Sequence, residues 1–314
     1  TGNTADITNK LKQVNANLNA MGGRATVAKG KMAGLGNSFT GVMGKASALS
    51  AGFLGIAAAI RAISGTVKTL ANFDFEMSKV EAISGATGKT LSEMTDLARK
   101  MGATTMYTAT EAASAMKFLS MAGFDAKQSM AALPATLDLA QAGTIDLGRA
   151  ADITSNIMAA YGIETERTNA VVDDMVSIVN NANTNVQQLG DAMKYVGAAA
   201  AASGVDIPTT AAAIGVLSNA GMQGAMAGTG LRQVFIRLTN VTGSAEDALS
   251  GMGLTLDQVN PQMVGLTQAI TRLREAGMSG AEAITIFGAR GAVAALNLAK
   301  GLPKYHELKD LMED

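Results

Sequence analysis

The residues most suggestive of phosphate chemistry are Gly85-Ala-Thr-Gly88-Lys89-Thr90. A P-loop has a Gly five positions before its Gly-Lys pair and follows a buried strand. That position holds Ile83, and the residues before it have helical periodicity. A second Gly-rich segment, Gly221–Arg232, also lacks the preceding strand that a dinucleotide fingerprint requires. We therefore predict no nucleotide cofactor, and we interpret Gly221–Arg232 as a mobile loop between closely packed helices.

Acidic and imidazole side chains do not form a recognisable catalytic or metal-binding set. Asp173 and Asp174 fall in a predicted helix, where we expect them on the solvated face. Glycoside hydrolysis needs a well-placed pair of carboxylates, and no acid here has a distinctive context. The chain has no Cys and a single His, His306, so a transition-metal site is not expected. We predict no catalytic residue, metal or cofactor, and the enzymatic alternative is a helical muralytic domain.

A repeated stop signal indicates how the chain is built. Helical runs end in Gly, an apolar residue and a polar residue, in Gly123-Phe124-Asp125, Gly162-Ile163-Glu164, Gly204-Val205-Asp206, Gly221-Met222-Gln223, Gly253-Leu254-Thr255 and Gly277-Met278-Ser279. Gly past a helix end adopts the left-handed conformation, and the next apolar side chain packs back on the last turn. We predict an all-α fold, an array of short Gly-terminated helices and helical hairpins. The predicted stop glycines are Gly123, Gly162, Gly204 and Gly221, with further stops at Gly102 and Gly143.

Cap residues predict where several of these helices begin. The predicted capping boxes are Thr90 with Glu93, Thr108 with Glu111, and Thr184 with Gln187. Pro208 suits the first turn of a helix after Asp206. Pro134 interrupts a periodic apolar pattern, so we expect it to kink or divide its helix.

The distribution of charge divides the chain. Residues 1–71 carry eight basic residues and one acid, a net charge of +7, whereas the remainder carries 17 basic and 25 acidic residues, or −8. We predict a basic, partly apolar helical arm at 1–71, a helical core domain at 72–240, and a smaller helical bundle with a charged tail at 241–314.

A nearly uncharged stretch at residues 46–60 lies within the basic arm. It is shorter than the about 20 apolar residues that a membrane-spanning helix needs, so a buried, interfacial or conditionally inserting helix is favoured. The residues of this candidate membrane-active stretch are Phe53, Leu54, Gly55, Ile56, Ile60 and Arg61. The arm's cations could instead meet DNA phosphates or a protein surface, or simply be solvated. No groove-reading motif is present, so sequence-specific nucleic-acid binding is not predicted.

Two long runs carry a family resemblance. KFLSMAGFDAKQSMAALPATLDLAQAGTIDLGRAADITSNIMAAYGI, at Lys117–Ile163, resembles the core domain of phage tail tape measure proteins of the lactococcal-phage type. NNANTNVQQLGDAMKYVGAAAAASGVDIPTTAAAIGVLSNAGMQGAMAGTGLRQVFIRL, at Asn180–Leu238, is similar to the same domain. The likeness covers about residues 73–238 and continues in IFGARG at Ile286–Gly291. Because the chain begins at Thr1 without Met and complete members are much longer, we expect a piece of a longer polypeptide.

The resemblance implies a structural virion protein and not an enzyme. Such proteins lie in the tail tube or at the tail tip, set tail length during assembly, and leave through the tip when DNA is delivered. The implied partners are tail tube and tail tip or baseplate hub proteins, tail assembly chaperones, further copies of the chain, and the host membrane. The implied locations are the virion tail, the host cytoplasm during assembly and the host envelope on ejection. A free-standing membrane-active helical protein is a further alternative.

The stop signals constrain that role. A ruler is most efficient as an extended helix, which rises about 1.5 Å per residue. Frequent Gly stops would fold the chain back on itself and shorten it. We therefore predict that this segment is a compact anchoring or initiating module at an end of the tape and not the measuring part.

Overall fold

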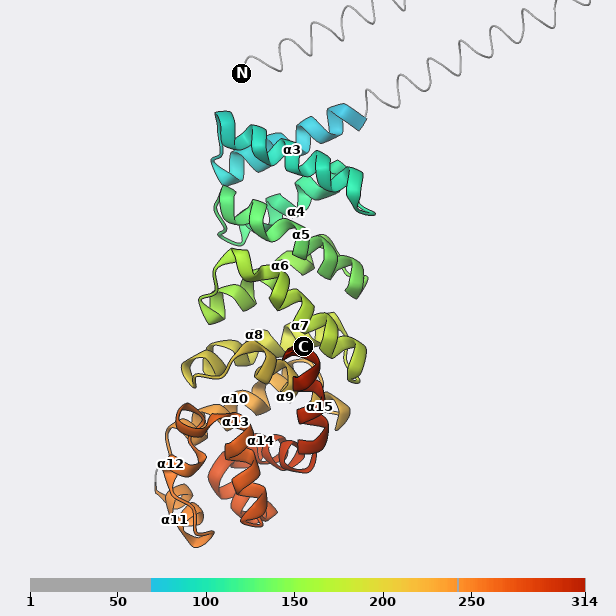
Figure 1. Ribbon diagram of the computed structural model, residues 1–314. Helices are drawn as coiled ribbons and strands as arrows, with labels where there is room; N and C mark the ends of the chain where they lie inside the picture. The colour runs from blue at the N-terminus through green and yellow to red at the C-terminus, as the bar shows by residue number, and fades with distance from the viewer. Residues whose placement is uncertain (1–68, 242, 314) are drawn as a thin grey trace, which may run out of the picture. The chain divides into compact units, whose positions relative to one another are not determined.

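A computed structural model describes residues 69–241 and 243–313 of the chain. Contacts divide the chain into two units, Thr1–Thr69 and Leu70–Asp314, and all the described residues after Thr69 belong to the second unit. The predicted membrane-active stretch, from Phe53 to Arg61, lies outside the described residues. The described part is built from helices and contains no strand, which confirms the all-α prediction (Figure 1).

The helices are short, and only brief turns separate them. After a helix at residues 69–84 come α3 (Gly88–Thr104), α4 (Ala109–Met121), α5 (Ala126–Gly143), α6 (Leu147–Tyr161), the 3-10 turn η1 (Thr165–Arg167), α7 (Thr168–Asn181), α8 (Val186–Ala202), α9 (Ile207–Asn219), α10 (Ala225–Thr239), α11 (Ser244–Gly251), α12 (Leu256–Val259), α13 (Pro261–Glu275), α14 (Gly280–Lys300) and α15 (Leu302–Glu313). A helix, not a strand, therefore precedes the Gly85–Thr90 segment.

Successive helices alternate between two rows. The helices α4, α6, α8 and α10 begin at residues 109, 147, 186 and 225, which are 38, 39 and 39 residues apart. Each contacts the next in its row, and α5, α7 and α9 do the same in the second row (Figure 1). The first row continues from α10 to α14 and the second from α9 to α15. A two-helix unit recurring at this interval is the architecture of helical repeat proteins, in which each unit covers the apolar face of its neighbour.

Six helices end in the same hydrogen-bond pattern with glycine in the left-handed conformation. At the end of α4 the Gly123 N–H donates to the Ser120 carbonyl at 3.1 Å, and the Phe124 N–H donates to the Leu119 carbonyl at 3.2 Å. Equivalent pairs of bonds close the helices before Gly162, Gly204, Gly221, Gly253 and Gly277, and all six glycines have positive φ. This arrangement is the Schellman motif, which satisfies the last carbonyls of a helix.

The helix stop predicted at Gly143 is present, but Gly143 is not the left-handed residue, and the stop predicted at Gly102 is wrong. Gly143 is the last residue of α5, and Thr144 after it takes the left-handed conformation, with φ of 49°. Gly143 is required for packing, because an added Cβ would come within 2.7 Å of the Val186 side chain. Gly102 lies inside α3, where an added Cβ would be 2.4 Å from the Ala109 backbone nitrogen. Both glycines allow close approach of the chain, and neither adopts the left-handed conformation.

The predicted caps are partly confirmed. The capping box of Thr108 with Glu111 is present, and Pro208 lies in the first turn of α9 after the Asp206 cap. The helix α3 instead begins after Thr87, and Asn185 caps α8 by accepting from the Gln188 N–H at 2.8 Å. The capping boxes predicted at Thr90 and Thr184 are therefore wrong. The observed cap residues lie three residues before Thr90 and one residue after Thr184.

The helix α5 continues through Pro134. Its neighbours on both sides, Leu133 and Ala135, are buried, as are Thr136 and Leu137. Packing of this face on adjacent helices outweighs the backbone hydrogen bond that Pro cannot make.

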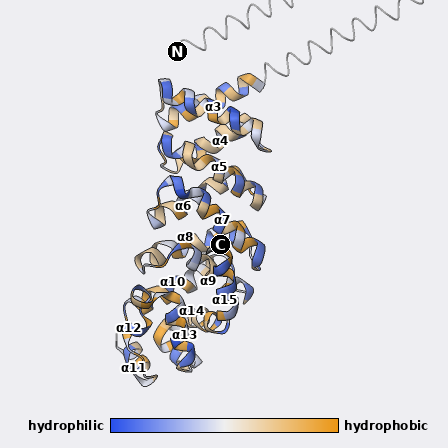
Figure 2. Ribbon diagram, in the orientation of Figure 1, coloured by the Kyte–Doolittle hydropathy of each residue, from blue (hydrophilic) through white to orange (hydrophobic). Residues whose placement is uncertain are grey.

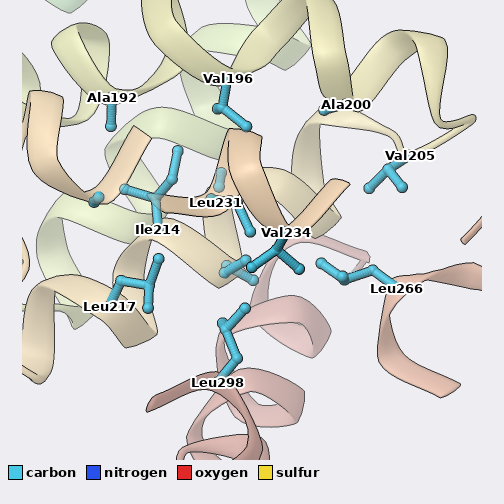
Figure 3. Packing of buried hydrophobic residues seen from close by; sticks show 14 of the residues in the cluster. Ala192, Val196, Ala200, Val205, Ile214, Leu217, Leu231, Val234, Leu266 and Leu298 are labelled. Carbon is cyan, nitrogen blue, oxygen red and sulfur yellow. The ribbon is translucent and has the colours of Figure 1, made fainter. Parts of the chain in front are cut away.

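Two apolar clusters fill the interior. One joins residues 73–151 of the helix at 69–84 and of α3 to α6, and the other extends from α5 to α15. Apolar and polar segments lie side by side along the helices of both rows (Figure 2). Figure 3 shows Leu266 of α13 and Leu298 of α14 next to Val234 of α10. Residues 243–313 thus share a core with the preceding helices and do not form a separate compact unit.

Candidate functional site

The Gly-rich segment at 221–232 is mostly helical. Only residues 221–224 form the turn before α10, which begins at Ala225, so the predicted loop is wrong. Glycine has a packing role here, because a Cβ at Gly228 would lie 2.3 Å from the Ala192 carbonyl oxygen of α8. A Cβ at Gly230 would lie 3.1 Å from the Ala294 Cβ of α14. The small residues let α10 lie directly against two other helices.

The IFGARG segment at 286–291 meets α10 from the other side. Gly288 has φ of 69° and ψ of 168°, so it breaks the regular conformation of α14. A Cβ at Gly291 would lie 3.0 Å from the Gln233 Cγ of α10. Two segments about 60 positions apart in the sequence are thereby brought into contact, which neither pattern predicted alone.

A groove lies between these two helices, and we call it the α10–α14 groove. Its larger part has a volume of about 530 Å³ and is lined by Met222, Ala225, Met226, Thr229, Gly230, Ala289, Arg290 and Val293. A smaller part of about 280 Å³ is lined by Thr229, Gln233, Phe287, Gly288, Ala289 and Arg290. The two parts share Thr229, Ala289 and Arg290, so they adjoin at these residues. Met226 and Val293 are 56% and 51% exposed, which leaves apolar surface in contact with solvent.

The charged residues of α10 and α14 nearest the α10–α14 groove are basic. Arg290 lines it, Arg237 lies one helical turn beyond Gln233, and Lys300 lies two turns beyond Val293, all of them exposed. The sequence has no acid between Asp206 and Glu246, and none between Glu282 and Glu307. Within the described residues, none of these three cations forms an ion pair. The groove therefore combines apolar walls with unpaired positive charge.

Comparison with known proteins relates this architecture to a family. The family model of phage-related minor tail proteins matches residues 95–289, more than half of the chain. The chain belongs to this family. The matched region includes all of α10 and the part of α14 up to Ala289, so it reaches both sides of the groove.

Two curated relatives are phage proteins. The chain is 30% identical over 307 residues to the tape measure protein of Pneumococcus phage Dp-1, which covers 96% of the chain and 26% of the relative. It is 31% identical over 202 residues to the probable tape measure protein of Escherichia phage P2, which covers 63% of the chain and 25% of that relative. The matches thus span about a quarter of each relative's length. No solved structure matches the chain.

Two ion pairs between buried or half-buried side chains connect different helices. Lys117 of α4 pairs with Glu76, which also accepts from Lys79 at 2.8 Å. Burial alone would raise the pKa of Glu76, but the hydrogen bonds and charges of both lysines outweigh it and lower that pKa. Arg149 of α6 pairs with Asp191 of α8. The Lys117–Glu76 and Arg149–Asp191 pairs each join two different helices, which indicates a structural role.

The aspartates in the second row differ from their predicted setting. Asp173 is exposed as expected, but Asp174 is half-buried. Burial, together with the charges of Asp173 and Asp206, raises the pKa of Asp174 to about 6. Burial and the charge of Asp173 also raise the pKa of Asp138. Neither part of the α10–α14 groove is lined by these acids.

Metal-binding clusters and membrane-spanning helices are both absent from the described residues. These residues contain no group of three or more His, Cys, Asp or Glu side chains arranged to hold a metal ion. In residues 69–241 and 243–313, no helix has both the length and the apolar character needed to cross a bilayer.

Proposed function

We propose that the chain is a segment of a phage tail tape measure protein. Membership of the minor tail protein family and similarity to two tape measure relatives support this. In this proposal the whole protein lies in the tail tube or at the tail tip, sets tail length during assembly and is released when DNA is ejected. Its partners would be tube and tip or hub subunits, tail assembly chaperones and other copies of itself. Assignment to the lactococcal-phage-type branch stays a prediction.

The segment's part in that function is compact anchoring or initiation, not measurement. The observation that carries this is the 39-residue interval between α6, α8 and α10. As one extended helix, 39 residues would span about 58 Å at 1.5 Å per residue. Stacked helices are about 8–10 Å apart, so each hairpin advances the row only by about that distance. Such an array therefore needs about six times as many residues as an extended helix to cover the same length.

Changing the number of hairpins tests this role. In the phage that encodes the chain, residues 147–185 would be deleted in one variant and duplicated in another, and tail lengths would be measured by electron microscopy. A measuring segment would shorten or lengthen the tail by about 58 Å. A compact module leaves the length of the tails that form unchanged. Proportional changes in both variants would refute the proposal, and the duplication keeps all native hairpins in case the deletion impairs folding.

Residues 1–71 are proposed to contact the host membrane during ejection. Their net charge of +7 and the apolar stretch at 46–60 support this. Dye leakage from vesicles containing anionic lipid would be compared between the full chain and a chain lacking residues 1–71. Equal leakage would exclude a membrane role for the arm, and a tail assembly defect without loss of lipid binding would instead indicate docking on tail subunits.

A further inference from the structure

We propose that the α10–α14 groove binds an amphipathic helix of a partner protein, with apolar residues on one face and acidic residues beside them. The inference depends on the geometry and charge of the groove and does not require a tape measure role. It also assigns a site to two segments, Gly221–Arg232 and Ile286–Gly291, that no catalytic chemistry explains.

The shape of the groove suits a helix. Among the lining residues Ala225, Gly230 and Ala289 are small, which leaves room for the side chains of an incoming helix. The walls carry Met226 and Val293, both more than half exposed. Met is flexible and polarisable, and it adapts to irregular apolar surfaces. Lining residues extend along α10 from Ala225 to Gln233, a rise of about 12 Å, which corresponds to about two turns of a bound helix.

The charge of the groove selects an acidic occupant. Arg237, Arg290 and Lys300 are exposed, have no described ionic partner and lie on chain segments without any acid. A neutral or basic helix would cover part of this surface while leaving the cations unpaired. Carboxylates flanking an apolar stripe would pair with them, and complementary charge contributes strongly to specificity and association rate.

Nucleic acid fits the lining less well than a helix does. Single-stranded DNA is held by aromatic side chains on which bases stack. The aromatic residue in the lining, Phe287, is fully buried in the core. The exposed walls are aliphatic, which matches Leu, Ile or Met side chains of a protein helix.

Synthetic helices provide the probe. A fluorescein-labelled peptide of about five turns would carry Leu at positions i, i+4, i+7 and i+11 and Glu at most other positions. One control peptide replaces Glu by Lys, and a second has the same composition with the Leu positions scrambled. Fluorescence anisotropy with the full chain should show that the acidic amphipathic peptide binds at least about tenfold more tightly than either control.

Variants locate the binding to the groove. Met226→Asp and Arg290→Glu should each lower the affinity for the acidic peptide by about tenfold or more. Arg290→Glu should also raise the affinity for the Lys peptide. Met263→Asp and Arg274→Glu on α13 change residues that are also exposed, so they serve as matched controls with affinity within about twofold of the parent chain. Circular dichroism would verify that every variant is folded. If Met226→Asp unfolds the chain, Val293→Asp replaces it.

Several outcomes would overturn the proposal. These are failure of the acidic peptide to bind, equal binding of the scrambled peptide, or unchanged affinity in both groove variants. Displacement of the peptide by single-stranded DNA or by phosphatidylglycerol vesicles, with groove variants losing that binding, would assign the groove to a different anionic partner. None of these results depends on tail length, so this proposal and the compact-module proposal can fail separately.

Discussion

Replacing Gly228 by Ala tests whether close approach of two helix backbones explains the glycines of α10. The added Cβ would lie 2.3 Å from the Ala192 carbonyl oxygen and 2.8 Å from the Ala192 Cα. These are backbone atoms of α8 and cannot move aside by changing rotamer, so α8 and α10 must separate. Overpacking of this kind costs about 1–3 kcal/mol, and the better helix propensity of Ala returns up to about 1 kcal/mol. We expect Gly228→Ala to lower the free energy of unfolding by about 1–2 kcal/mol.

Gly251 is the matched control. It ends α11 with an ordinary helical conformation, and a Cβ there would meet nothing within 4 Å. Gly251→Ala should therefore raise the free energy of unfolding by about 0.5–1 kcal/mol. Thermal unfolding followed by circular dichroism at the helix band would show opposite shifts, of about 2–4 °C per kcal/mol for a unit of this size. If Gly228→Ala is as stable as Gly251→Ala, the close-approach argument is refuted.

Three further substitutions test other features by chemical denaturation. Thr144→Gly should stabilise the chain by up to about 1 kcal/mol, because it removes a β-branched residue from φ of 49°; a loss of stability would contradict this. Glu76→Gln should destabilise by about 1–3 kcal/mol at pH 7, because Lys117 loses its buried carboxylate. Since the pKa of Glu76 is lowered in the folded state, its stabilisation is present above the ordinary value of 4.5 and is lost as pH falls through the folded value. If the difference in free energy of unfolding between Glu76→Gln and the parent chain did not decrease on acidification, the stabilising role of this ion pair would be contradicted. Asp174→Asn should stabilise by about 1 kcal/mol or less at pH 7, after allowance for solvent screening, with the gain disappearing as pH falls from 6 to 4. The raised pKa makes the folded state bind more protons than the unfolded state in that window, so a pH-independent gain would show that the Asp174 charge is not the cause.

Features that depend on neighbouring residues were predictable. The six Gly-apolar sequences that suggested helix stops each occupy a Schellman motif, whose two bonds join residues three and five positions apart. The Thr108 capping box likewise involves only Thr108 and Glu111. Prediction failed where two local patterns competed. Thr184 and Asn185 are both good caps, and Asn185 is the one that accepts from the Gln188 N–H, so α8 begins one residue later than predicted.

The amino-acid pattern was sufficient to indicate an all-helical chain, its hairpins and its family, because hydrogen bonds at helix ends and apolar periodicity are properties of short segments. The function of the remaining glycines was decided by tertiary structure. Gly228 and Gly230 resembled loop residues in sequence, and only the positions of Ala192 and Ala294 on other helices show that they are contact points. The α10–α14 groove depends on that same contact. The width of a groove depends on the distance between its two helices, and that distance is set by residues far apart in the chain.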